Sequence, residues 1–303
     1  RENVLSLEVV LSDGRVIRTA QRARKSSSGY DLTKMFVGSE GTLGIITKVT
    51  LKLYGIPEAA SAAVVSFDTL KGAVDAVIAS IQWGIPMARI ELLDDVQMGA
   101  INNYAGLDYP VKPTLFLEFH GTEAGVAEQA ERMADVCGEY GGSNFSWTAD
   151  AEERDKLWAA RHDAAYSAIA LRPGCAVMAT DVCVPISKLA DCIIATKQDI
   201  DEAGIVAPIV GHVGDGNFHA QLLIHPDTRE EDLKICGEIN RRLVERAIAM
   251  DGTCTGEHGV GQGKMKYLEA EHGEALNVMR TLKIALDPQN IMNPGKMFLL
   301  NET

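Results

Sequence analysis

Gly211-His212-Val213-Gly214-Asp215-Gly216-Asn217-Phe218-His219 places two histidines on either side of a glycine-rich turn. The dipeptide Asp215-Gly216 is favoured in two-residue type I′ turns, because both turn positions require a positive φ. A turn centred there predicts a hairpin in which His212 lies directly opposite His219, with Cβ atoms roughly 5 Å apart. A helix would separate the two imidazoles by about 10 Å. The stretch therefore predicts a β-hairpin that can present both histidines to one metal ion.

A further candidate ligand lies about forty residues along the chain, in Gly256-Glu257-His258-Gly259. Glu257 completes a His₂Glu set with the two histidines, and such a set with open positions is typical of catalytic metal sites. The same residues would also suit a metal-dependent hydrolase, in which His258 acts together with a water molecule. A glycine-rich hairpin with two partly exposed histidines and no metal is the simpler alternative.

Composition excludes several classes of partner. The 303 residues carry a formal net charge of −13, which opposes binding to nucleic acid or to anionic lipid. No apolar run approaches the roughly 20 residues of a transmembrane segment, and no signal peptide is recognisable. The chain begins with Arg1 rather than Met, so we expect a processed product or a fragment. Six cysteines without a Cys-x-x-Cys pair favour free thiols in a reducing compartment.

The first 55 residues predict strands and loops. A hairpin is expected over residues 5–19, with its turn at Asp13-Gly14, and the β-branched run 45–53 predicts a further strand. The loop Gly38-Ser39-Glu40-Gly41-Thr42-Leu43-Gly44 offers backbone N–H groups and two hydroxyls with little side-chain bulk. Such a loop can hold a pyrophosphate, or can be only a tight connection between strands.

From about residue 60, strands and helices follow in the order β-α-β-β-α-β, which is that of a ferredoxin-like unit. Asp68 and Thr122 are the expected N-caps of the two helices. The pattern comprises strand 62–67, a helix from 68 to Gly84, strands 89–93 and 114–119, a helix to Tyr140, and a strand near Phe145.

The same order recurs in the second half of the chain. Asp150 and Glu153 form a capping box that begins a connecting helix to about Leu171. The repeat then comprises strand 177–184, helix 187–203, strands 206–212 and 219–225, helix 231–250 and a short strand at 253–254. The two halves share this pattern without convincing sequence identity. A helix over 274–286 and the loop 293–296 complete the chain.

These segments together resemble a known family. Residues 30–33 and 38–47 resemble the second half of the FAD-binding domain of the vanillyl-alcohol-oxidase type flavoproteins. Residues 212–219, 256–259 and 290–296 resemble the substrate domain and C-terminal closure of their D-2-hydroxyacid dehydrogenase branch. The motifs follow the family's order over nearly the whole chain. The family's N-terminal Pro-Gly-Gly loop is absent, so the chain resembles the C-terminal two-thirds of such an enzyme.

The resemblance implies an α+β fold in three parts. Residues 1–55 would be the C-terminal part of a PCMH-type FAD-binding domain. Residues 56–286 would form the substrate-binding cap domain, built from two ferredoxin-like βαββαβ units with a large antiparallel sheet. Residues 287–303 would be a C-terminal segment that returns to the FAD site.

The resemblance also implies the roles of individual residues. His212, His219 and Glu257 would bind a divalent metal, most simply zinc. His258 would be the general base, and Arg161 and Asn217 would bind the substrate, although Asn217 also suits a turn. FAD would be held by the loop after residue 37 and by the C-terminal closure, through Gly38, Ser39, Glu40, Gly41, Thr42, Gly44, Ile46 and Asn293.

The implied reaction is oxidation of a D-2-hydroxyacid to the 2-oxoacid, with proton transfer to His258 and hydride transfer to the flavin. Relatives that act on D-2-hydroxyglutarate carry a lysine and a hydroxyl residue where this chain has Ala179 and Ala165. A second substrate carboxylate would therefore lack a partner, unless Lys264 or Arg172 reaches it, and D-lactate is favoured.

Glycolate and D-2-hydroxyglutarate remain alternative substrates, and an inactive fragment or a structural partner subunit is an alternative to an enzyme. The expected electron acceptor is a cytochrome, a quinone or an electron-transfer flavoprotein, and a homodimer is possible. We expect the protein in the cytoplasm of a bacterium or in the mitochondrion of a eukaryote.

Overall fold

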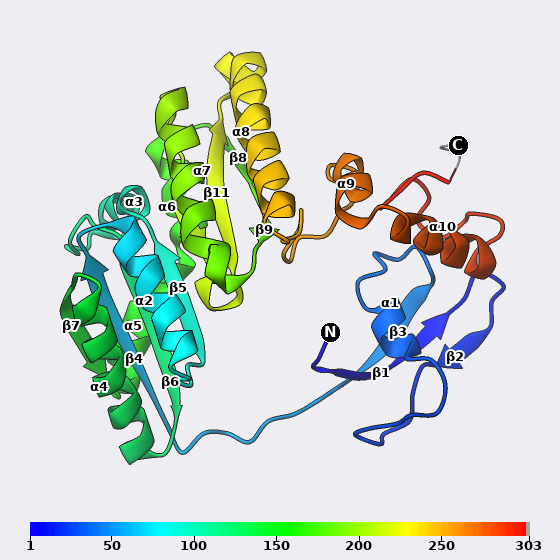
Figure 1. The fold of residues 1–303 in the computed structure, drawn as a ribbon, viewed down its shortest axis with the longest axis horizontal. Helices are drawn as coiled ribbons and strands as arrows, with labels where there is room; N and C mark the ends of the chain where they lie inside the picture. The colour runs from blue at the N-terminus through cyan, green and yellow to red at the C-terminus, as the bar shows by residue number, and fades with distance from the viewer. Residues whose placement is uncertain (301–303) are drawn as a thin grey trace. The chain divides into compact units, whose positions relative to one another are not determined.

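The computed structural model describes residues 1–300, which divide into two compact units (Figure 1). The larger unit is Pro57–Gly256, and the smaller combines Arg1–Ile56 with the chain from Glu257 onward. Residues 257–286, expected in the cap domain, thus belong to the compact unit that also contains the N-terminus. Within this unit, Leu286 packs against the hydrophobic core of the N-terminal segment.

The larger unit is built on one antiparallel sheet, with strand order β7-β4-β6-β5-β10-β11-β8, and β9 also pairs with β11. The first four of these have the order of a ferredoxin-like unit, and β10, β11 and β8 repeat that order in reverse. The two halves meet where β5 pairs with β10, with Leu93 opposite Val210. The last strand of the second half is reduced to a bridge between Cys183 and Thr253. Its strands are β4 (Ala59–Phe67), β5 (Arg89–Leu93), β6 (Thr114–Gly121), β7 (Gly142–Thr148), β8 (Ala176–Ala179), β9 (Val182–Cys183), β10 (Ile209–Gly211) and β11 (Asn217–Ile224). The doubled unit and the large antiparallel sheet predicted from the sequence are confirmed.

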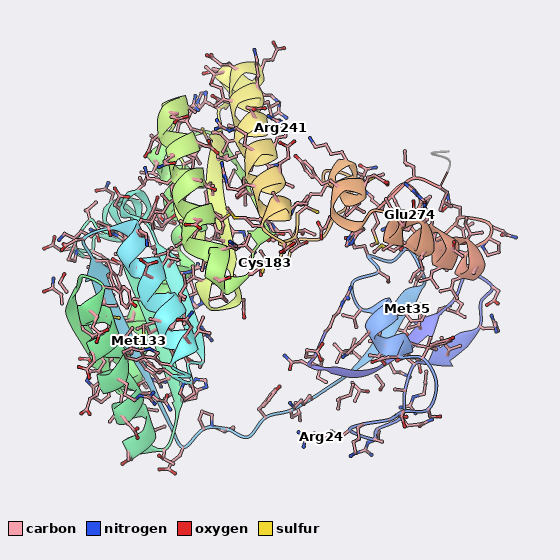
Figure 2. The ribbon with its side chains drawn as sticks, in the orientation of Figure 1. Arg24, Met35, Met133, Cys183, Arg241 and Glu274 are labelled. Atoms are coloured by element: carbon pink, nitrogen blue, oxygen red, sulfur yellow. The ribbon has the colours of Figure 1, made fainter. Side chains whose placement is uncertain are left out.

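Two layers of helices cover this sheet. One layer holds the two helices of each ferredoxin-like unit: α2 (Leu70–Gln82), α4 (Glu123–Glu139), α7 (Leu189–Ala203) and α8 (Arg229–Ala249). The other holds α3 (Asp95–Ala105), α5 (Ala151–His162) and α6 (Ala164–Leu171). The side chains of Leu93, Phe116 and Trp158 form part of the core beneath this second layer. In the first layer, Met133 of α4 is completely buried (Figure 2).

Several element boundaries depart from the sequence prediction. Thr122 and Asp150 are confirmed as N-caps, whereas α2 is capped by Thr69, whose hydroxyl accepts from the Gly72 N–H, rather than by Asp68. The connecting helix is broken at Asp163 into α5 and α6. The predicted strand 177–184 is interrupted between β8 and β9, because each pairs separately with β11. Helix α3 was missed altogether.

Asp94 is the N-cap of α3 and is fully buried, with its Oδ1 accepting from the Gln97 N–H at 2.8 Å. Burial raises the pKa of this carboxyl to about 7. Since the folded-state pKa lies above the unfolded value, the stabilisation is fully present below about pH 4 and is lost as the pH rises through 7. We therefore expect Asp94→Asn, which keeps a capping oxygen, to increase the free energy of unfolding at pH 8 by a few kcal/mol.

Chemical denaturation of this variant and of the parent chain at pH 8 and pH 4 checks the expectation. The gain should be several-fold smaller at pH 4, where the parent carboxyl is already protonated in the folded state. An equal difference at both pH values would assign the effect to packing rather than to the charge.

The connection between β10 and β11 differs from the predicted type I′ turn. Val210, rather than His212, pairs with His219. Residues Val213–Asp215 form a 3-10 turn, and of the predicted turn pair only Gly216 has a positive φ, of 80°. A Cβ at Gly216 would lie 2.2 Å from the Val184 carbonyl oxygen. The loop thus packs on the chain after β9 instead of folding back at once, and the predicted register was wrong.

The smaller unit contains a three-stranded sheet of order β2-β1-β3. Its elements are β1 (Val4–Val10), β2 (Val16–Arg18), α1 (Leu32–Phe36), β3 (Ile45–Leu51), α9 (Leu268–His272) and α10 (Ala275–Leu286). The predicted N-terminal hairpin is confirmed. Its core contains Leu7, Val9 and Phe36, and Leu286 of α10 packs against it. Within residues 1–300 we find no helix with the length and apolar character that a bilayer span requires.

Candidate active site

The two histidines of the quoted stretch lie close together despite the different register. Their ring centroids are 5.9 Å apart, with the ring planes at 85°. The Nδ1 of His219 is 2.8 Å from the Thr180 carbonyl oxygen, and the Nδ1 of His212 is 2.7 Å from Glu91 Oε1. A ring nitrogen that faces an oxygen acceptor carries a proton, and in a neutral imidazole the lone pair then lies on Nε2. Both rings are therefore oriented as metal-binding histidines usually are.

Glu91 on β5 is a site residue that the sequence analysis missed. Its Oε2 accepts from Arg161 Nε and Nη2, at 3.2 and 2.9 Å, while its Oε1 faces His212. The residue is only 7% exposed. Its partners are 70 and 121 residues away in sequence, so no local pattern could reveal them. The one available signal was a carboxylate within the otherwise apolar stretch from Ile90 to Leu93.

The strand register places Glu91 and His219 on one face of the large sheet. Glu91 and Leu93 share a face because they are two residues apart in a strand. Leu93 pairs with Val210, and Val210 pairs with His219. Cross-strand partners point to the same side. Arg161 reaches this face from α5, so the structure brings the predicted substrate-binding arginine to the histidine pair.

Asn217 is held in a buried network rather than in open space. Its Nδ2 donates to Asp181 Oδ1 at 3.0 Å and to the Val182 carbonyl oxygen at 2.8 Å. Asp181 is fully buried and also accepts from the Thr255 hydroxyl at 2.7 Å. The buried Oδ1 of Asn217 has no hydrogen-bond partner within residues 1–300. Binding of substrate by Asn217 would therefore have to use this oxygen.

The same network determines the backbone that leads to Glu257. A Cβ at Gly256 would lie 2.2 Å from Asn217 Nδ2, so no side chain fits at this position. Glu257 follows by one peptide bond, which places its Cα about 3.8 Å from that of Gly256. His258 comes next, with its Nε2 3.5 Å from Glu257 Oε1. Glu257 and His258 thus directly follow Gly256, the last residue of the larger unit.

Glu40 fixes the residues that follow His258. Its carboxylate accepts from the N–H groups of Val260 and Gly261, at 2.6 and 2.8 Å. Gly259 has a φ of 84°, and a Cβ there would lie 2.9 Å from Glu40 Oε1. Glu40 is also a predicted FAD residue, and its side chain joins the loop 38–44 to the segment that carries the candidate base.

The predicted FAD loop connects α1 to β3. Gly38, Glu40 and Gly41 have φ values of 88°, 51° and 73°, which bend the loop tightly. Thr42 donates both its N–H and its hydroxyl to the Ser39 carbonyl oxygen. Ile46, also predicted for FAD, lies beyond the loop in β3 and is 39% exposed.

Gly44, at the end of this loop, allows no side chain. A Cβ there would lie 2.7 Å from Val9 Cγ1 and 2.9 Å from the Val10 carbonyl oxygen. The loop thus approaches the sheet backbone closely at Gly44. These features fit a loop that approaches a phosphate group through its backbone.

The C-terminal segment closes on the same loop. Asn293 Nδ2 donates to the Glu40 carbonyl oxygen at 2.5 Å. The buried ammonium of Lys283 donates to the carbonyl oxygens of Thr42 and Met292, each at 2.8 Å, and pairs with Asp287. A cavity of about 240 Å³ lies beside these groups, and Thr42, Asn290, Asn293 and Lys296 line part of it. This volume is below the range of ordinary cofactor pockets, so the predicted FAD residues would enclose only part of such a site.

Comparison with known proteins gives consistent matches. Residues 56–297 match the family described as FAD linked oxidases, C-terminal domain. A probable mitochondrial D-lactate dehydrogenase of Danio rerio is 53% identical over all of this chain and 62% of its own length. A mitochondrial D-lactate dehydrogenase (cytochrome) of Arabidopsis thaliana is 47% identical over 98% of this chain and 52% of its own. The glycolate oxidase subunit GlcD of Bacillus subtilis is 36% identical, covering 98% and 63%. The chain thus spans between about half and two thirds of these relatives.

Solved structures share the fold at much lower identity. A 4-ethylphenol oxidase from Gulosibacter chungangensis superposes with a TM-score of 0.76 at 17% identity, covering 99% of this chain and 66% of that one. A p-cresol methylhydroxylase superposes with a TM-score of 0.74, also at 17% identity and with the same coverage. These likenesses confirm the predicted α+β fold with its large antiparallel sheet.

Proposed function

The chain belongs to the family of FAD linked oxidases, C-terminal domain, and from this premise we propose that it carries the substrate-binding part of an FAD-dependent D-2-hydroxyacid dehydrogenase that oxidises D-lactate. The observation that carries this proposal is the pair of histidines, each held through Nδ1, beside the Glu91–Arg161 ion pair. The relatives named D-lactate dehydrogenase support the same assignment.

We propose that His212, His219 and Glu257 hold one divalent metal ion, most simply zinc. Two imidazoles and one carboxylate leave open positions on such an ion, as in catalytic zinc sites. A bound metal supplies Lewis acidity, which lowers the pKa of a substrate hydroxyl. In the chain itself, the Glu91 carboxylate and the Thr180 carbonyl oxygen orient the two imidazoles for this purpose.

Arg161 is the proposed partner of the substrate carboxylate. Two of the five guanidinium N–H groups are used on Glu91, and Nη1 has no partner within residues 1–300. This nitrogen can donate to a carboxylate oxygen without breaking the ion pair. His258 would take the proton of the α-hydroxyl, because it follows a metal ligand without being one itself.

FAD, when bound, accepts the hydride from the substrate α-carbon. We propose that Gly38, Ser39, Glu40, Gly41, Thr42, Gly44, Ile46 and Asn293 hold part of it. For Glu40 the contribution would come through its backbone, since its carboxylate already accepts from Val260 and Gly261.

A cavity of about 390 Å³ adjoins His212 and Glu91 and is lined in part by Ile81, Ile85 and Ile90. Arg161 and His219 are not among its lining residues, so the preference for a short monocarboxylic substrate rests on the missing cation and not on this cavity. Arg89 also lines it, but its guanidinium lies over the ring of Trp158 and near Glu118.

Arg172, which could have replaced the cation missing at Ala179, is paired with Asp232 at 2.9 Å. A second substrate carboxylate would therefore find no cation at position 179 or at Arg172, and we propose that Lys264 does not reach it either. We expect kcat/KM of the flavin-loaded enzyme for D-lactate to exceed that for D-2-hydroxyglutarate by about tenfold to a hundredfold. Initial rates with an artificial dye acceptor, measured for D-lactate, glycolate and D-2-hydroxyglutarate, test the assignment. Equal or greater kcat/KM for D-2-hydroxyglutarate would contradict it, and a preference for glycolate would favour the activity for which the Bacillus subtilis relative is named.

A metal-dependent hydrolase would use the same ligand set, and flavin absorbance of the purified enzyme distinguishes the two classes. For the electron acceptor we propose a cytochrome, as the name of the Arabidopsis thaliana relative suggests, with a quinone or an electron-transfer flavoprotein as alternatives. We further propose a mitochondrial location if the chain comes from a eukaryote, since the two D-lactate dehydrogenase relatives are named mitochondrial. A homodimer is a further proposal, which the oligomeric state in solution would test.

A further inference from the structure

Arg161, Glu91 and His212 form one continuous hydrogen-bonded chain within the larger unit. The three residues come from α5, from β5 and from the end of β10. The side chains of Glu91 and Arg161 are only 10% and 15% exposed, so water screens their interaction little. The chain connects the proposed substrate-binding group with a proposed metal ligand through a single carboxylate.

We propose that Glu91 is a positioning residue that selects the metal-binding tautomer of His212 while it orients Arg161. This inference rests on the metal site proposed above. An arginine can only donate hydrogen bonds, so one oxygen of Glu91 must accept from Arg161. The other oxygen can also only accept, and it therefore requires a proton on His212 Nδ1. The lone pair of His212 then lies on Nε2, where a metal ion can use it.

Glutamine at position 91 would reverse the requirement for a proton on His212 Nδ1. Glu91→Gln keeps the size of the side chain but offers one oxygen and one NH₂ group. The oxygen would still face Arg161, which has no acceptor, so the NH₂ group would face His212. An NH₂ donor calls for a lone pair on Nδ1, which moves the ring proton to Nε2 and blocks the metal. We expect Zn²⁺ affinity to fall by about 10- to 100-fold, the usual effect of losing the partner that orients a metal-binding histidine.

The neighbouring strand provides a matched control. Glu118 on β6 also lies between an arginine and a histidine, with its Oε2 3.9 Å from Arg89 Nε and its Oε1 2.6 Å from His120 Nε2. Its side chain is 11% exposed, close to the value for Glu91. His120 is not a proposed ligand. Glu118→Gln thus makes the same chemical change on the same sheet without touching the proposed metal site.

The experiment measures Zn²⁺ affinity of the 303-residue chain by competition with a chromogenic chelator, with circular dichroism to compare folding. We expect Glu91→Gln to bind at least tenfold more weakly than the parent chain, and Glu118→Gln to bind within about twofold of it. Equal affinity of Glu91→Gln and the parent chain would overturn the inference, as would an equal loss in Glu118→Gln. A parent chain that binds no Zn²⁺ would overturn the metal site itself, which is a different result.

A second variant separates the tautomer from general damage to the fold. In Glu91→Gln combined with Arg161→Met, the arginine no longer claims the amide oxygen. The glutamine can then rotate and accept from His212 Nδ1, so Zn²⁺ affinity should return to within a few-fold of the parent value. A double variant that binds as weakly as, or more weakly than, Glu91→Gln alone would show that Glu91 does not act through the His212 tautomer.

Discussion

Replacing either His212 or His219 by alanine is expected to lower the affinity of the chain for Zn²⁺ by well over 100-fold. Each substitution removes an atom that would bind the metal directly, whereas loss of an orienting partner alone costs about 10- to 100-fold. The two imidazoles are the only nitrogen ligands in the proposed set. A single histidine with one carboxylate would leave the ion mostly hydrated and weakly held. Metal analysis after dialysis, together with competition titration, checks this expectation.

His225→Ala provides the control for these variants. His225 directly follows β11, the strand that contains His219, and its Nδ1 accepts from the Asp227 N–H at 3.2 Å. It takes no part in the proposed ligand set, so its loss should leave the metal content unchanged. Full metal content in both the His212 and His219 variants would contradict the site, as would an equal loss in His225→Ala.

The doubled βαββαβ pattern could be predicted because its signals are local. Helix starts such as Thr122 and Asp150 are marked by side chains that accept from an N–H three residues on. What the pattern could not show is how the two halves join. The pairing of β5 with β10 links residues more than a hundred positions apart, and no short stretch of sequence encodes it.

The residues of the candidate site likewise divide into those that could be predicted from local sequence and those that could not. His212 and His219 could be paired from sequence because any short connection between adjacent antiparallel strands brings its two ends together, even though the type I′ turn was wrong. Glu91 could not be found, because it acts through Arg161 and His212, which other elements supply. Glu257 was proposed as a ligand because it completes a His₂Glu set, whereas the roles of Arg161 and of His258 as the base came from the family resemblance. All three roles stay predictions.

The smaller unit contains a buried ion pair, which composition alone does not predict because lysine is rarely buried. Lys283 lies in the last turn of α10 and is 3% exposed, and Asp287 directly follows the helix and is 1% exposed. The two side chains form an ion pair across one helical turn. Asp287 also accepts from the N–H groups of Ile291 and Met292. The pair thus ties α10 to the C-terminal loop and, through the Thr42 carbonyl oxygen, to the predicted FAD loop.

We expect Lys283→Met to lower the free energy of unfolding of the smaller unit by about 3–5 kcal/mol, because it leaves the Asp287 carboxylate buried without its partner. Lys71 and Asp75 give a matched control, since they form an ion pair with the same spacing on α2 but the Lys71 side chain is 63% exposed. Lys71→Met should cost less than about 1 kcal/mol. The measurement is denaturant unfolding of both variants, with proteolysis of the C-terminal segment as a second assay. Equal losses in the two variants would contradict a special role for the buried pair.

The pH dependence of the same stability gives an independent check. Burial raises the pKa of Asp287, but hydrogen bonds from Lys283, Met292 and Ile291 outweigh it, and the net pKa lies below the ordinary value of 3.8. A carboxyl whose pKa is lowered by folding contributes stability that is present above the unfolded pKa and is lost as the pH falls through the folded one. The parent chain should therefore lose this contribution only below about pH 4.

In Lys283→Met the hydrogen bond that lowers the pKa of Asp287 most is gone. Burial then acts with less opposition, so the pKa of Asp287 rises. The stability deficit of Lys283→Met should consequently shrink as the pH is lowered towards 4, because protonation removes the unpaired charge. A deficit that stays constant between pH 7 and pH 4 would show that Lys283 stabilises the unit by packing alone.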